Sequence, residues 1–299
     1  MSSQKQEVVK RITVPEITAR KGGKPIVMLT AYDAPTAEIM DPHCDVLLVG
    51  DSLGMAVHGM TSTVGVTLEM MILHGQAVMR GSKRALVVID MPFGSYEAGV
   101  EQAYANSVRI LKETGAQAVK VESGPEVPAT IEYLVKRGVP VMGHVGLVPQ
   151  SINIDGSFKA KGREAAEHER ILQSAHDTAD AGAFSVVIEG VAEGLAREIT
   201  EAIAKPTIGI GIGIGASAAC DGQVLVTPDT LGMFDWTPKF VRKYADLRTE
   251  IGRAVETYAA DVRARRFPAE VETYFSKKAG SAVAPVLSSR GVARARGTL

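Results

Sequence analysis

Short apolar segments alternate with longer segments of helical period along most of the chain. The short segments are apolar at consecutive positions, which is typical of strands that are covered on both faces, as in parallel sheets. Seven of them predict strands, and a weaker candidate predicts an eighth. These strands are expected at residues 25–31, 45–50, 85–91, 118–122, 140–146, 184–190 and 206–211, with the weaker one at 237–241.

The segments between the strands predict helices that end at glycine. We expect helices at residues 67–80, 97–114, 125–137 and 164–181, each followed by a glycine that can close the helix in the left-handed conformation. Each glycine stop is shortly followed by a predicted strand. Seven or eight strands in this β-α-β order predict a (β/α)8 TIM barrel in preference to an open doubly wound sheet. A long helical stretch is expected after the last strand, at residues 243–265.

The composition changes near both ends of the chain. We expect residues 1–12 to form a flexible segment, residues 13–275 a single barrel domain, and residues 276–299 a disordered basic tail. The tail contains no acidic residue and carries the cations Lys277, Lys278, Arg290, Arg294 and Arg296.

Bulk properties exclude several classes of protein. The 299 residues are 45% hydrophobic, enough for a large core, and the net charge of −1 gives no bias toward nucleic acid or membranes. The polar first ten residues do not resemble a signal peptide, and no apolar run approaches the length of a membrane helix. Two distant cysteines, Cys44 and Cys220, make no disulfide framework. We therefore expect a cytoplasmic protein.

Polar or ionisable side chains lie at or near the carboxyl ends of five successive predicted strands. They are Asp51 with Ser52, Asp90, Glu122 with Lys120 two positions earlier, His144, and Glu189. The carboxyl ends of barrel strands form the active-site face, and an unpaired charge is costly to bury in a core. These side chains are therefore predicted to converge on one cavity.

Three of these acids predict a metal site. Asp51, Asp90 and Glu122 would repel one another unless a divalent cation lay between them, and hard oxygen donors favour Mg²⁺, partly through water. Such an ion could bind a 2-oxo acid and stabilise its enolate. Taken singly, each residue has an ordinary alternative: a helix cap for an Asp, an ion pair for Glu122 or Lys120, and a structural histidine for His144.

Longer motifs in the same regions resemble ketopantoate hydroxymethyltransferases, and the resemblance runs from about residue 26 to about residue 271. The motifs occur in the family's order. They include LTAYDA at 29–34, LLVGDSLGM at 47–55, VIDMPFGSY at 88–96, VKVESG at 119–124, GHVGLVPQS at 143–151, VVIEGV at 186–191 and CDGQVLV at 220–226.

The resemblance implies a barrel of the phosphoenolpyruvate/pyruvate superfamily. It also implies transfer of a hydroxymethyl group from 5,10-methylenetetrahydrofolate to 3-methyl-2-oxobutanoate, giving 2-dehydropantoate for pantothenate biosynthesis. Members are typically cytoplasmic homo-oligomers, often decamers. The residues that match family roles are Asp51, Asp90 and Glu122 for Mg²⁺; Asp51, Ser52, Asp90, Lys120 and the further active-site His144 for the substrate; and Glu189 as the proton acceptor.

Two other functions fit parts of the sequence. A magnesium-dependent carbon–carbon lyase or mutase of the same superfamily would share the metal and the enolate, but commonly needs a reactive cysteine in a loop near the metal. A catalytically inert barrel that serves as a binding module is the other alternative. It is suggested by the run IGIGIGIG at residues 208–215, where the family pattern has a single IGIG.

Overall fold

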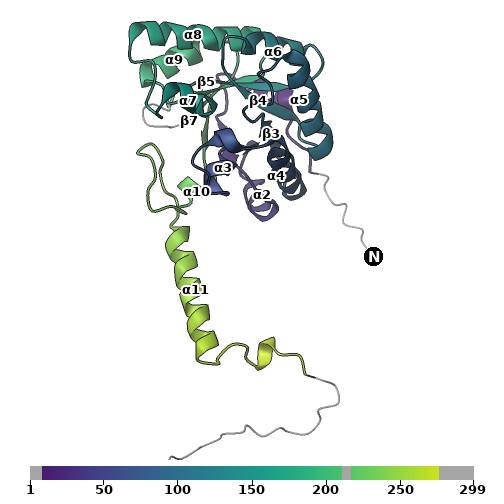
Figure 1. The fold of residues 1–299 in the computed structure, drawn as a ribbon, viewed down its shortest axis with the longest axis vertical. Helices are drawn as coiled ribbons and strands as arrows, with labels where there is room; N and C mark the ends of the chain where they lie inside the picture. The colour runs from purple at the N-terminus through teal and green to yellow at the C-terminus, as the bar shows by residue number, and fades with distance from the viewer. Residues whose placement is uncertain (1–8, 211–216, 276–299) are drawn as a thin grey trace, which may run out of the picture. The chain divides into compact units, whose positions relative to one another are not determined.

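The computed structural model describes residues 9–210 and 217–275. Eight parallel strands close into a barrel in the order β1 to β8, which confirms the predicted (β/α)8 fold (Figure 1). The last strand pairs with the first, and this register places Ile26 opposite Gly222. The strands are β1 (Ile26–Thr30), β2 (Val46–Val49), β3 (Leu86–Asp90), β4 (Ala118–Glu122), β5 (Val141–Gly146), β6 (Ser185–Glu189), β7 (Thr207–Ile210) and β8 (Gly222–Leu225).

Helices follow most of the strands and cover the outside of the barrel. Thr67 caps α4, because its side chain accepts a hydrogen bond from Met70 N. The α-helices are α1 (Val14–Thr18), α2 (Ala34–Met40), α3 (Leu53–Ala56), α4 (Leu68–Gly81), α5 (Val100–Thr114), α6 (Val127–Val135), α7 (Ile152–Asp155), α8 (Ala165–Asp180), α9 (Glu193–Ala202), α10 (Thr227–Thr230) and α11 (Leu247–Arg263). Single 3₁₀ turns are η1 (Thr63–Gly65), η2 (Pro149–Ser151) and η3 (Glu270–Glu272).

The glycines after the helices serve two different purposes. Gly115, Gly138 and Gly182 have positive φ, as predicted for residues that close a helix. Gly81 does not, and it belongs to α4. A Cβ there would lie 2.2 Å from the carbonyl oxygen of Ala34, so this glycine lets α4 approach the start of α2 closely.

The prediction of the eighth strand was wrong. Residues 237–241 form no strand, and the barrel is closed by β8 instead. The β8 sequence, GQVL, contains an exposed Gln223 and lacks a continuous apolar run. Its first residue is Gly222. A side chain would not fit at this position, because a Cβ would lie 2.6 Å from the carbonyl oxygen of Ile26.

Alternation of side chains along the strands explains how the barrel positions polar groups. Leu86 and Val88 on β3 belong to the apolar cluster inside the barrel. Val87 and Ile89 belong to a different cluster, which they form with residues of α4 and α5 on the outside of the barrel. A period of two therefore turns Asp90 toward the inside. The same alternation on β4, β5 and β6 turns four further side chains inward, two or four positions beyond the interior apolar residue of each strand: Lys120, Glu122, His144 and Glu189.

The chain divides into two compact units, Met1–Arg248 and Thr249–Leu299. The first contains the barrel. The second contains most of α11, on which none of the residues is buried, and a contact between the rings of Tyr258 and Phe267. The proposed flexible segment 1–12 and basic tail 276–299 remain predictions, since residues 1–8 and 276–299 lie outside the described residues. Most of the glycine run, residues 211–215, lies outside them as well.

Candidate active site

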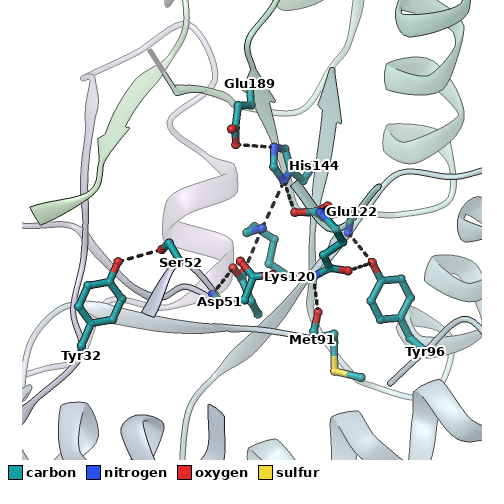
Figure 2. Close-up of polar contacts among 11 residues, drawn as sticks. Tyr32, Asp51, Ser52, Met91, Tyr96, Lys120, Glu122, His144 and Glu189 are labelled. Carbon is teal, nitrogen blue, oxygen red and sulfur yellow. Dashed lines mark hydrogen bonds and ion pairs between the residues drawn. The ribbon is translucent and has the colours of Figure 1, made fainter. Parts of the chain in front are cut away.

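The predicted site residues come together at the carboxyl ends of β2 to β6 (Figure 2). Lys120 Nζ lies 3.0 Å from Asp90 Oδ1, and the backbone N–H of Asp51 donates to Asp90 Oδ2 at 3.0 Å. Lys120 is opposite Asp90 in the register of β3 and β4, and Glu122 is opposite His144 in that of β4 and β5. Adjacent strands thus deliver the charged groups as neighbours. All of these side chains are buried.

Gln150, which the sequence did not single out, joins two of the acids. Its side-chain N–H₂ donates to Asp51 Oδ2 at 2.8 Å and to the carbonyl oxygen of Met91 at 2.9 Å. Its backbone N–H donates to Glu122 Oε2 at 2.9 Å, and Tyr96 donates its hydroxyl proton to Gln150 Oε1 at 2.7 Å. One buried residue on η2 therefore fixes one oxygen of each of two carboxylates. The motif GHVGLVPQS contains it, and only that motif could have drawn attention to it.

Burial, with a smaller contribution from neighbouring carboxylates, raises the pKa values of Asp51 and Glu122. Burial raises the pKa of Asp51 well above its usual range, and the carboxylates of Asp90 and Glu122 raise it further. Burial also raises the pKa of Glu122 to about 7, against the attraction of Lys120. Burial alone would lower the pKa of Lys120, but the surrounding carboxylates outweigh it and keep the ammonium charged. Three carboxyl groups thus face one ammonium, and a divalent cation could bind there by displacing the protons that the raised pKa values retain.

His144 and Glu189 form the other half of the site. His144 Nδ1 lies 3.3 Å from Lys120 Nζ and 3.4 Å from Glu122 Oε1. On the other side of the ring, Nε2 lies 3.1 Å from Glu189 Oε2. This second contact is at ion-pair distance but lacks the alignment of a hydrogen bond. Burial lowers the pKa of His144, so the ring is neutral. An ammonium can only donate, so Nδ1 accepts from Lys120 and the proton is assigned to Nε2, facing Glu189.

Glu189 has one oxygen without a partner. Its Oε1 is buried and makes no hydrogen bond, while Oε2 faces His144. Burial raises the pKa of Glu189, in the direction that its position after an apolar strand predicts, and His144 opposes the rise. A carboxylate with a raised pKa and a free oxygen is suited to accept a proton.

Ser52 lies beside the acids and is held by Tyr32. The two hydroxyl oxygens are 2.8 Å apart. Tyr32 belongs to the motif LTAYDA, but the sequence gave no separate signal for it. Ser52 follows Asp51 in the chain, and both residues line the cavity described below.

The site opens into a cavity of about 570 Å³. Its charged base includes Asp51, Asp90, Lys120 and Glu189, and apolar side chains such as Trp236 line another part. A volume of this size is typical of pockets for small-molecule ligands.

The carboxylates of Asp51, Asp90 and Glu122 have the chemistry that Mg²⁺ prefers, but not the geometry of an ion held by protein ligands alone. Within residues 9–210 and 217–275, no three His, Cys, Asp or Glu side chains are grouped so that they could hold one ion together. The Oδ1 of Asp90 is buried without a hydrogen bond, apart from its ion-pair distance to Lys120. Carboxylate oxygens with mutual repulsion suit a hard cation, and Mg²⁺ usually retains several water molecules.

Neither cysteine has the properties of a reactive thiol. Both are buried, and burial raises the pKa of Cys44 to about 11 and that of Cys220 above its usual value. Neither is among the residues that line the cavity. This argues against the lyase alternative, which commonly needs a reactive cysteine near the metal.

Comparison with known proteins decides the family. The sequence profile described as ketopantoate hydroxymethyltransferase matches residues 11–270. The chain belongs to the ketopantoate hydroxymethyltransferase family. Among its relatives, the 3-methyl-2-oxobutanoate hydroxymethyltransferase of Phenylobacterium zucineum is 71% identical over 93% of this chain and 99% of that protein. The enzyme of the same name from Caulobacter vibrioides is 67% identical over 93% of this chain and 100% of that protein.

Solved structures that resemble this family member share its fold at low sequence identity. A 2,3-dimethylmalate lyase of the PEP mutase/isocitrate lyase superfamily has a TM-score of 0.56 and 15% identity, over 87% of this chain and 91% of that one. A phosphonopyruvate hydrolase in complex with oxalate and Mg²⁺ has a TM-score of 0.56 and 12% identity, over 84% and 88% of the two chains. These similarities support the (β/α)8 barrel fold.

Proposed function

We propose that this enzyme transfers a hydroxymethyl group from 5,10-methylenetetrahydrofolate to 3-methyl-2-oxobutanoate, in pantothenate biosynthesis. In the overall reaction a C–C bond forms between C3 of the oxo acid and the one-carbon unit. Water supplies the hydroxyl oxygen, and tetrahydrofolate and 2-dehydropantoate are released. The observation that carries this proposal is the free Oε1 of Glu189, which lies across the same cavity from a carboxylate and lysine cluster in a chain of this family.

Asp51, Asp90 and Glu122 are the proposed holders of Mg²⁺, with Gln150 fixing the orientation of two of them. When bound, the ion would supply Lewis acidity that polarises the carbonyl of the oxo acid. A phosphonopyruvate hydrolase of the same fold has been solved with the dicarboxylate oxalate and Mg²⁺, which supports the choice of ion. Ser52 and Asp51 are the proposed contacts to the oxo acid group beside it.

Glu189 is the proposed base that removes the C3 proton. Its Oε1 is free to accept the proton, and the raised pKa moves its basicity closer to that needed for a weakly acidic carbon. His144 Nε2 lies 3.1 Å from Glu189 Oε2, so the ring packs against that oxygen and leaves Oε1 as the free one. The negative charge that develops on the oxo acid is stabilised by the ammonium of Lys120, whose charge the neighbouring carboxylates maintain.

A proton-exchange experiment tests this assignment without the folate. The enzyme is incubated with 3-methyl-2-oxobutanoate and Mg²⁺ in D₂O, and the C3 proton is followed by NMR. We expect loss of the C3 proton signal with the wild-type enzyme, no loss with Glu189→Gln, and wild-type exchange with Glu193→Gln, an exposed acid on the next helix. Exchange by Glu189→Gln at the wild-type rate would remove Glu189 from the role of base.

We further propose that the protein is a cytoplasmic homo-oligomer, with the decamer as its expected form. It acts on small molecules and binds neither nucleic acid nor membranes. Among the described residues, no helix is long and apolar enough to cross a membrane. The family resemblance supports the assembly. Light scattering of the purified chain measures it directly, and a monomer at micromolar concentration would contradict it.

A further inference from the structure

The cavity has a second, aromatic wall that the charged site does not use. Met55 on α3 lines it, and so does Phe158, between α7 and α8. The segment after α10 contributes Phe234, Trp236 and Phe240. These side chains are apolar, whereas those at the base of the cavity are charged. The two parts of the cavity therefore suit ligand groups of different chemistry.

These aromatic side chains are more exposed than the core. Trp236 has a relative exposure of 75% and Phe158 of 44%. Large aromatic groups at the mouth of a cavity offer flat faces on which a planar ring can stack. A small branched oxo acid held at the carboxylate cluster would leave this part of the cavity free.

An unpaired carboxylate lies beside the aromatic side chains. Asp229 on α10 lines the cavity, and among the described residues its carboxylate takes part in no hydrogen bond or ion pair. Burial raises the pKa of Asp229, and the positive charge of Lys243 opposes the rise. A half-buried carboxylate without a partner is costly unless a ligand supplies donors.

We propose that Asp229 and the aromatic side chains of Phe234, Trp236 and Phe240 form the subsite for the pterin ring of the one-carbon donor. The ring presents two adjacent donors, its N3–H and its 2-amino group, which one carboxylate can accept with both oxygens. The ring faces stack on the aromatic wall. This inference rests on the proposed function, since it assigns the second substrate of the same cavity.

Steady-state kinetics with matched variants test the subsite. Asp229→Asn replaces one acceptor oxygen by an amide, and Trp236→Leu removes the stacking face. We expect each to raise the KM for 5,10-methylenetetrahydrofolate about tenfold or more, with the KM for 3-methyl-2-oxobutanoate within about twofold. The controls are Asp235→Asn and Tyr244→Leu, whose side chains lie in the same segment but do not line the cavity, and both should keep wild-type constants.

The single tryptophan supplies a binding signal that needs no turnover. Trp236 is the only tryptophan in the sequence, so titration with tetrahydrofolate should quench the fluorescence, corrected for ligand absorption, of the wild-type protein. The same titration of Asp229→Asn should give a dissociation constant about tenfold higher or more. A saturable quench with an unchanged constant in Asp229→Asn would overturn the role of Asp229, and the absence of any quench would overturn the subsite.

The two proposals fail separately. Deuterium exchange at C3 of the oxo acid, without folate, should persist in Asp229→Asn, because it depends on Glu189. If the wild-type protein shows no exchange but Trp236 is quenched, the proposed function fails and the pterin subsite stands. If exchange is normal and neither variant changes the KM for the folate, the subsite fails alone. Equal increases of both KM values in Asp229→Asn would also overturn the subsite.

Discussion

Replacement of Gln150 by alanine tests whether this residue orients the proposed metal ligands. The side chain makes three buried hydrogen bonds: to Asp51 Oδ2 at 2.8 Å, to the carbonyl oxygen of Met91 at 2.9 Å, and from the Tyr96 hydroxyl at 2.7 Å. A bond to a carboxylate contributes about 1.5–3 kcal/mol, and each neutral group left unpaired costs about 1–3 kcal/mol. Water that enters the vacated space would recover part of this. We therefore expect a net loss of about 2–4 kcal/mol of unfolding free energy.

The effect on the metal is separable from the effect on stability. Without the amide, Asp51 loses the hydrogen bond that lowers its pKa and fixes its rotamer, so Mg²⁺ should bind about 10- to 100-fold more weakly. Tyr96→Phe is the matched control, because it removes the hydroxyl from Gln150 but leaves the amide on Asp51, and should weaken the metal by less. Isothermal titration calorimetry with Mg²⁺ measures the affinity, and urea unfolding of the metal-free protein measures the stability.

Gln150→Ala should lower both quantities. Mg²⁺ affinity within twofold of wild type would refute the orienting role, whatever the stability. If Gln150→Ala and Tyr96→Phe lowered the Mg²⁺ affinity equally, the amide bond to Asp51 would not be the interaction that orients this ligand. The hydrogen-bond network as a whole would then be responsible.

Other predictions follow from the same structure. Glu189→Gln should reduce turnover by at least about 10²-fold while isothermal titration finds 3-methyl-2-oxobutanoate binding largely unchanged, because the base does not hold the substrate; normal turnover would contradict it. Burial raises the pKa of Glu122 to about 7, so a proton competes with Mg²⁺ below that pH. Affinity should fall about tenfold per pH unit below pH 7 and level off above it, whereas a flat profile from pH 5.5 to 8 would contradict the assignment. Gly81→Ala should destabilise the barrel by about 1–3 kcal/mol in urea, because its Cβ would lie 2.2 Å from the Ala34 carbonyl, while Gly252→Ala on α11 meets no atom within 4 Å and should not destabilise.

The strands could be predicted where burial on both faces leaves a continuous apolar run, as in the residues before Asp90 and Glu189. The convergence of the polar groups was then predicted from their position at the carboxyl ends of successive barrel strands. β8 could not be predicted in this way, because Gly222 and Gln223 interrupt the apolar pattern, and its place is set by pairing with β1 and β7. The local sequence pattern of residues 222–225 does not indicate which strands they will pair with.

The site was predicted as far as groups on the strands define it. Gln150 was missed because its hydrogen bonds join residues far apart in the sequence; Asp51 lies 99 positions before it. The aromatic wall was missed for a related reason: Phe158 and Trp236 lie in irregular segments, and only the closed barrel brings them to one cavity. Side-chain roles that depend on such contacts need the three-dimensional structure.

We propose that this cavity performs magnesium-dependent hydroxymethyl transfer. The most direct measurement is formation of 2-dehydropantoate from 3-methyl-2-oxobutanoate and 5,10-methylenetetrahydrofolate, by the purified chain, after removal of metal and after addition of Mg²⁺. We predict turnover that is lost with the metal, restored by Mg²⁺, and absent in Glu189→Gln. Product formed equally well without any divalent cation would contradict the proposed metal site, and no product under any of these conditions would contradict the proposed function.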